Sequence, residues 1–264
     1  MFTNWDVLIF ILFFNSFNFQ SDSYLNESFE EGIDYSLWKN QKGIVDETTI
    51  VDTLAFVGSK SLRIVHSFDS TSRSERNELV LRDGPLKKIR HGEHHWFRVA
   101  YYIPVSWEFE KSPKMGEIVS QWHHGLAHKF GGPSPMAIII DRDHWKVKSS
   151  FGDPHSKGNF EKSLVKTNKN VLEDELLVEK GKWNVWLIHS YWSNSAEGLI
   201  EGWLNGEKVF IKKGPNCYAN IDLYWKIGIY KPAWYKNRRT TSTLKREIFI
   251  DGLVHAKDSI NLFK

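Results

Sequence analysis

Three short stretches of the sequence carry polar side chains at alternate positions, the spacing that places side chains on one face of a β-strand. The first is residues 117–125. If these residues form a strand, one face carries Val119, Gln121 and His123, and the other carries Ile118, Ser120 and Trp122. An amide and an imidazole then point the same way, and we expect this strand to be the centre of a reactive site.

The other two stretches supply charged groups and a phenol. In the second, Arg76 and Glu78 share a strand face, where Glu78 can orient Arg76 through a charge-assisted bond. In the third, Lys226, Gly228 and Tyr230 share a face, and Gly228 leaves room for a close approach to the backbone. We predict that the three strands lie side by side and line one groove.

This set of groups fits β-elimination on a uronic acid polymer. The hydrogen on C5 of a uronate is weakly acidic unless the adjacent carboxylate is neutralised, and amide and guanidinium donors can do this as an oxyanion hole does. A neutral His or an ionised Tyr can then take the proton, and a protonated Tyr can give one to the leaving glycosidic oxygen. The sequence therefore indicates a carbon–oxygen lyase.

Each stretch also has a structural interpretation, because an Arg-x-Glu pair is often a surface pair, a Gln-x-His strand a solvated face, and a Tyr beside a Gly a packing contact. The functional interpretation depends on all three occurring together. A non-catalytic lectin-like sandwich that binds acidic glycans is the alternative, since many Trp and a basic edge would suit it equally. A laminarinase-like hydrolase is disfavoured, because no Glu-x-Asp-x-x-Glu pattern is present.

Composition and turn spacing predict the scaffold. The chain has 264 residues, a net charge of +3 and 12 Trp, most of which we interpret as core. Apolar and alternating segments recur between turn residues, and the clearest hairpin turns at Asn205-Gly206. We predict a single all-β domain over residues 23–264, a two-sheet antiparallel β-sandwich of jelly-roll type with a concave substrate groove. The segment 167–180 could be a short helix or a long loop.

Within this scaffold the three stretches resemble those of known enzymes. Gln121-Trp-His123 resembles the Gln-x-His strand of alginate lyases and, with Gly125 close behind, the Gln-Trp-His-Gly stretch of heparin lyase I. Residues 226–231 are similar to their Lys-x-Gly-x-Tyr strand, and residues 76–79 to their Arg-x-Glu-Leu element. The chain thus resembles the jelly-roll polysaccharide lyases over nearly its whole mature length, and its compact size is more similar to that of the glucuronan lyases than to that of the larger heparin lyase I.

The resemblance implies roles for individual residues. Gln121 and Arg76 would bind the uronate carboxylate, and His123 would be a base or charge neutraliser. Tyr230 would be the acid, or both base and acid in a syn elimination, so the group that removes the C5 proton is either His123 or Tyr230. Lys226 would contact substrate, beside Glu78. Alginate lyases often carry a second Arg where this chain has Val80, which favours a glucuronan-like polymer over alginate.

Some assignments stay open. A one-residue slip would exchange His123 for His124, so His124 is also a candidate substrate contact. Arg73-Ser-Glu75 competes with Arg76-Asn-Glu78 for the same role. A basic edge follows Tyr230 and is either a solvated loop or a subsite for an anionic chain. It consists of Lys231, Lys236, Arg238 and Arg239.

The remaining signals concern location and cofactors. An apolar run at residues 7–14, followed by polar residues, predicts a secretion signal over residues 1–22 and therefore an extracellular enzyme. We expect it to be a monomer. We expect an anionic polysaccharide as partner, and neither nucleic acid nor membrane. The single cysteine, Cys217, is interpreted as incidental. No cofactor is required, although Glu30 or Asp251 could serve a structural calcium. The spacing of His91, His94 and His95 does not match a recognised zinc site.

Overall fold

The computed structural model describes residues 23–68, 75–81, 89–111, 116–124, 132–152, 160–164, 176–218, 221–236 and 241–257. Within these ranges the chain is almost entirely β-structure, with one short helix, α2 (Pro232–Lys236). No helix in the described ranges is long and apolar enough to cross a membrane. The predicted secretion signal and most of the segment 167–180 lie outside the described residues.

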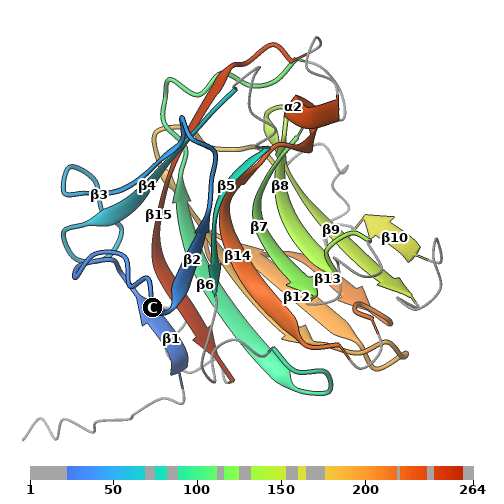
Figure 1. Cartoon of the computed structure of the whole chain (residues 1–264). Coiled ribbons are helices and arrows are strands. Elements are labelled where there is room, and N and C mark those ends of the chain that lie inside the picture. Colours follow the sequence, from blue (N-terminus) through green and yellow to red (C-terminus); the bar gives the residue numbers. More distant parts are fainter. Residues whose placement is uncertain are drawn as a thin grey trace, which may run out of the picture.

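The strands form two antiparallel sheets that pack face to face (Figure 1). The first sheet has the order β13 (Glu207–Lys213), β12 (Leu199–Leu204), β11 (Trp183–Tyr191), β6 (His94–Tyr102), β15 (Lys245–Ala256), β4 (Ser61–Ser67) and β3 (Glu47–Val51), with β1 (Ser23–Glu27) also paired to β15. The second has the order β10 (Phe160–Leu164), β9 (His144–Gly152), β8 (Met136–Asp141), β7 (Glu117–His124), β14 (Leu223–Tyr230), β5 (Arg76–Leu81) and β2 (Trp38–Gln41). The predicted two-sheet antiparallel sandwich is confirmed.

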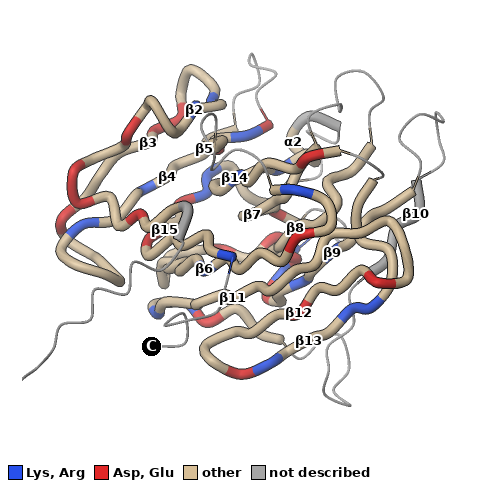
Figure 2. The backbone as a smooth tube through the Cα atoms, turned by 90° about the horizontal axis from the view of Figure 1, so that it is seen from below, with Lys and Arg blue, Asp and Glu red and all other residues tan. Residues whose placement is uncertain are grey.

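Aromatic side chains fill the space between the sheets. Trp122 of β7 and Trp225 of β14 stack with ring centroids 5.9 Å apart, and Phe97 of β6 packs edge-on against both. Of the 12 Trp in the sequence, eight are buried within the described residues, which agrees with the interpretation of most Trp as core residues. Most inward positions of the second sheet are apolar, and the exceptions include Asn77, Ser120 and His124. Figure 2 shows Lys and Arg interspersed with Asp and Glu over the described strands and turns.

Two irregularities in the second sheet change which side chains face outward. The pairing of β7 with β8 shifts between Ile118 and Ser120, and Val119 lies in the core. The prediction that Val119 shares a face with Gln121 is therefore wrong, because a bulge interrupts the alternation. The pairing of β14 with β7 shifts between Ile227 and Tyr230, around Gly228.

Gly228 is required by the neighbouring strand rather than by a ligand. Its φ is 133°, and a Cβ there would lie 2.4 Å from the carbonyl oxygen of Asn77 on β5. Asn77 itself faces inward and donates to the carbonyl oxygens of Glu47 and Val65 in the opposite sheet, at 2.8 Å each. These contacts fix β5 in the orientation that turns Arg76 and Glu78 outward.

Candidate active site

The outer face of β5, β14 and β7 brings the three predicted stretches together. Gly228 pairs with Glu78 and Tyr230 with Arg76 on one side of β14. On its other side, Lys226 pairs with Gln121. The prediction that the three strands lie side by side is confirmed by this register, which places β14 between β5 and β7.

Glu78 is the centre of the polar contacts on this face. Its carboxylate accepts a hydrogen bond from Nε2 of Gln121 and lies 3.5 Å from Nη1 of Arg76 and 3.6 Å from Nζ of Lys226. Glu78, Gln121 and Lys226 are each at most 3% exposed. A buried carboxylate with three donors around it fixes the directions of those donors.

The same donors have further partners. Ser134 donates to the Gln121 carbonyl oxygen at 3.2 Å, so the amide NH₂ must point toward Glu78. Nζ of Lys226 donates to Oε1 of Gln41 on β2 at 3.0 Å. Burial lowers the pKa of Lys226, while Glu78 opposes that shift.

His123 lies next to Tyr224 on β14, because the register pairs these two residues directly. Their rings stack with centroids 5.6 Å apart and planes inclined by 25°. Burial lowers the pKa of His123 to about 4, and the positive charges of Lys226 and Arg76 act in the same direction. The imidazole is therefore neutral near pH 7. Its Nδ1 lies 2.9 Å from the backbone nitrogen of His124 and 3.1 Å from the backbone oxygen, which is compatible with either tautomer.

Tyr230 lies at a different place on the strand. It is six residues from Tyr224, which corresponds to about 20 Å at a rise of ~3.3 Å per residue. Its ring is covered by the guanidinium of Arg76, 4.2 Å from the centroid. Burial raises the pKa of Tyr230 to about 12, with a further contribution from Glu75. The register therefore places Tyr224, and not Tyr230, beside His123.

We call Arg76, Glu78, Gln121, His123, Tyr224 and Lys226 the outer-face cluster. It combines fixed donors that can neutralise a carboxylate with an imidazole and a phenol in contact. The model of one family, described as polysaccharide lyase, matches residues 29–254 of the chain. The chain belongs to the polysaccharide lyase family.

Solved structures show the same fold at low sequence identity. An endo-β-1,4-glucuronan lyase from the fungus Trichoderma reesei is 16% identical with a TM-score of 0.72, covering 88% of this chain and 94% of that one. The cellulose-induced protein Cip1 is 12% identical with a TM-score of 0.58, covering 89% and 97%. An exolytic alginate lyase from Zobellia galactanivorans is 11% identical with a TM-score of 0.54, covering 84% and 95%. A comparison with curated proteins gives no match.

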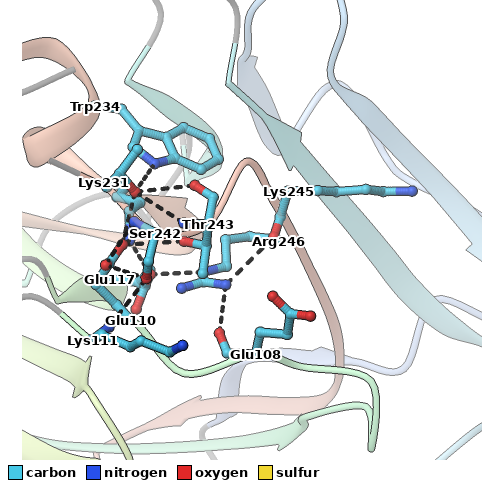
Figure 3. A network of polar contacts seen from close by, with 11 residues as sticks. Glu108, Glu110, Lys111, Glu117, Lys231, Trp234, Ser242, Thr243, Lys245 and Arg246 are labelled. Carbon is cyan, nitrogen blue, oxygen red and sulfur yellow. Dashed lines mark hydrogen bonds and ion pairs between the residues drawn. The ribbon is translucent and has the colours of Figure 1, made fainter. Parts of the chain in front are cut away.

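Two predicted substrate contacts of this polysaccharide lyase lie inside the protein. His124 is fully buried, faces the core against Tyr218, and has no hydrogen bond from either ring nitrogen to any described residue. Lys231 is also fully buried and pairs with Glu110 and Glu117 (Figure 3). Both predictions need correction, because each residue follows an outward-facing one and strand alternation turns it inward. Arg239, with Arg238, lies outside the described residues, as does Arg73.

The sequence interpretation missed several members of the site. The sequence pattern could have predicted that Tyr224 faces outward, since it continues the alternation of Lys226 and Tyr230 toward the start of β14. Glu75, which pairs with Nη2 of Arg76 at 2.8 Å, was considered only as a rival to Glu78. Gln41 and Ser134 come from distant parts of the chain, and no local pattern marks them.

Other features of the lyase do not contribute to this site. A cavity of about 290 Å³ lies at the end of the first sheet and contains none of the outer-face cluster. It is lined by Pro104, Ser106, Trp107, Glu108, Thr243, Leu244, Lys245 and Glu247. Cys217 is buried, and burial raises the pKa of its thiol to about 12, so it is not a thiolate nucleophile.

The two residues considered for calcium hold a loop. Oxygens of Glu30 accept from the backbone nitrogens of Ser59 and Lys60, and Oδ2 of Asp251 accepts from those of Phe56 and Val57. Ca²⁺ takes six to eight oxygen ligands, whereas the described residues contain no group of three or more His, Cys, Asp or Glu that could hold a metal. Calcium at these residues stays a prediction, and no step below uses it.

Proposed function

We propose that this polysaccharide lyase cleaves a uronate-containing polysaccharide by β-elimination, with a glucuronan-like polymer as the preferred substrate. The observation that carries the proposal is the contact between a neutral imidazole and a phenol, His123 and Tyr224, beside a set of carboxylate-directed donors. A lectin-like binding module needs no such pair, so this contact favours catalysis over the binding alternative.

The first role in the proposed reaction is neutralisation of the substrate carboxylate. Arg76 and the Gln121 amide donate to Glu78, which keeps both donors aimed at the outer face. A uronate carboxylate near these donors would lose much of its negative charge, and the C5 hydrogen would become more acidic. Glu78 acts here as a positioning residue.

The second role is proton transfer. The lowered pKa of His123 keeps the imidazole neutral, so it can accept a proton or donate through its N–H. Burial and Glu78 raise the pKa of Tyr224, which keeps the phenol protonated and able to give a proton to the glycosidic oxygen. The C5–H bond breaks, its electron pair forms the C4–C5 double bond, and the C4–O bond breaks with protonation of the leaving oxygen.

The choice of polymer is supported by two observations. The fold is shared with a glucuronan lyase over most of both chains. Val80 stands two residues after Glu78, at the position where the resemblance expects a second Arg in many alginate lyases. Both support a glucuronate polymer, and secretion, predicted from residues 7–14, would give the enzyme access to it.

The test is a panel of polyuronates that includes glucuronan, alginate and heparin-type chains, assayed by the ultraviolet absorbance of the unsaturated uronate product. We expect the fastest rise on glucuronan. A His123→Ala variant that keeps its melting temperature should lose the signal. Folded wild-type protein that produces reducing ends without the absorbance would indicate hydrolysis, and folded protein that binds polymer without either signal would indicate a lectin.

A further inference from the structure

A row of outward-facing positions crosses the second sheet at one level of the register. The burial pattern shows which face it occupies, because Trp38, Trp145 and Val147 on the flanking strands point into the core. In order, the pairs are Lys39 with Val80, Val80 with Lys226, Lys226 with Gln121, Gln121 with Ala137, and Ala137 with Lys148. The row therefore passes directly through the outer-face cluster.

The two ends of this row differ from its middle. Lys226, Gln121 and Ala137 are buried, whereas Lys39 and Lys148 are exposed. Neither exposed lysine forms an ion pair with any residue that the structure describes. Lys146, the other outward lysine of β9, is neutralised by Asp141 at 2.8 Å. Within the described part of the chain, two ammonium groups without a carboxylate partner thus flank the cluster on opposite sides.

The distances fit a glycan that lies across the strands. Neighbouring strands are ~4.8 Å apart, which is close to the length of one pyranose unit. Lys39 on β2 is two strands from Lys226 on β14, or about 10 Å, and Lys148 on β9 is three strands away on the other side, or about 14 Å. A polymer centred over the cluster would present sugars near both ammonium groups.

We propose that Lys39 and Lys148 bind carboxylates of uronate units on either side of the cleavage point. The preferred substrate is then a chain with uronates spread over about five consecutive sugars, the span of six neighbouring strands at ~4.8 Å each. This inference rests on the proposed function, since it extends the same site. Exposed ion pairs contribute little individually, so each lysine tunes affinity and substrate length rather than the chemical step.

The experiment compares glucuronan-derived oligosaccharides of three to eight units on wild type and on Lys39→Gln, Lys148→Gln and the double variant. Lys213→Gln, an exposed lysine on β13 of the other sheet, is the control. We expect each single variant to raise KM for the long oligosaccharides about two- to fivefold at low salt, with kcat unchanged, because these contacts bind ground and transition states equally. The trimer should be unaffected, and the loss should shrink at high salt.

The possible results distinguish a failure of the lysine subsites from a failure of the proposed lyase function. If wild type is active and both lysine variants match Lys213→Gln on long oligosaccharides, the outlying subsites are wrong while the lyase assignment stands. An equal loss on trimer and octamer would also overturn the inference, because a length-independent effect is not an outlying contact. If wild type forms no unsaturated product from any polyuronate, the proposed function fails and this inference with it.

Discussion

The strands β7 and β14 carry two clusters of charged residues that differ in what they can do. At one end of these strands lies an end network of Glu110, Glu117, Lys231 and Arg246, joined by Ser242 and neighbouring Thr side chains (Figure 3). All four charged residues are at most 2% exposed. Hydrogen bonds from Ser242 and Thr241, with the charge of Lys231, hold the pKa of Glu110 far below its ordinary value despite burial.

The outer-face cluster in the middle of the same strands is built differently. It pairs one buried carboxylate, Glu78, with two cations, and it adds an imidazole and a phenol that are only partly buried. The end network contains acidic and basic side chains in matched pairs, which suits holding strands in place. The outer-face cluster contains groups that exchange protons, which suits chemistry. Burial and charge are common to both clusters, and the proposed active site differs by its accessible proton carriers, His123 and Tyr224.

The largest expected effect comes from removing the phenol next to His123. Tyr224→Phe keeps the ring that stacks on His123 and removes only the hydroxyl. We expect kcat to fall about 10²–10⁴-fold, the usual contribution of a positioned acid or base. The measurement is the initial rate of unsaturated product on the best polyuronate, with circular dichroism to show that the fold is retained.

Tyr230→Phe is the matched control for that experiment. Its ring packs under Arg76 about 20 Å along the strand from Tyr224, so we expect less than about a tenfold change in kcat. The reverse result, in which Tyr230→Phe is inactive and Tyr224→Phe is active, would show that the acid is at the other end of the cluster.

The next effect should appear in stability. Lys231→Met removes the cation between Glu110 and Glu117 and leaves buried carboxylates with fewer partners. We expect a loss of about 3–5 kcal/mol in the free energy of unfolding, the usual result of removing one partner of a buried pair. Urea unfolding measures it, with Lys213→Met as a control that should change by less than ~0.5 kcal/mol. An unchanged unfolding free energy would contradict the structural role given to the end network.

A smaller effect should follow from pH, through histidines that neither cluster uses. Burial lowers the pKa of His95 and His124 to about 4 and that of His255 to about 3. In the unfolded chain these groups titrate near 6.5, so between pH 6.5 and 4 the unfolded state binds more protons and stability falls as the pH falls. We expect about 1 kcal/mol of loss per histidine between pH 7 and pH 5.5.

Melting temperatures from pH 7.5 to 5.5 test this, since carboxylates change little in that range. A His124→Phe variant that folds should show a shallower slope, because one of the titrating groups is gone. A slope equal to that of wild type would indicate that His124 is not held neutral in the folded protein.

The sequence predicts strands well where alternation is local. The segment 145–149 and the Asn205-Gly206 hairpin, with φ of 50° and 84°, form as expected. The adjacency of β5, β14 and β7 also follows from the motifs. The register of these strands does not follow from the motifs, because it depends on pairing between segments about 100 residues apart. This register decides whether His123 lies next to Tyr224 or Tyr230.

The burial of Lys231 and His124 was not predicted from the sequence, for a different reason. Alternation turns both inward, whereas a one-residue register slip made His124 a candidate substrate contact and a run of basic residues made Lys231 one. Lys231 is buried because Glu110 and Glu117, which belong to other parts of the chain, pair with it. The burial of such a charge cannot be predicted locally, since it depends on partners that lie far away in sequence.

The smallest expected effect tests whether the end network contributes only to stability. Thr243→Val replaces a hydroxyl that lies 3.2 Å from Oε2 of Glu110 by a methyl group of similar size. Glu110 keeps its bonds from Ser242, Thr241 and Lys231, so we expect only about 1 kcal/mol of destabilisation in urea unfolding and no change in kcat. If the end network only holds the strands, activity will not respond to this change. A fall in kcat larger than about threefold in a variant this stable would show that the two clusters are coupled through β7 and β14, and that the end network also sets the geometry of the reactive groups.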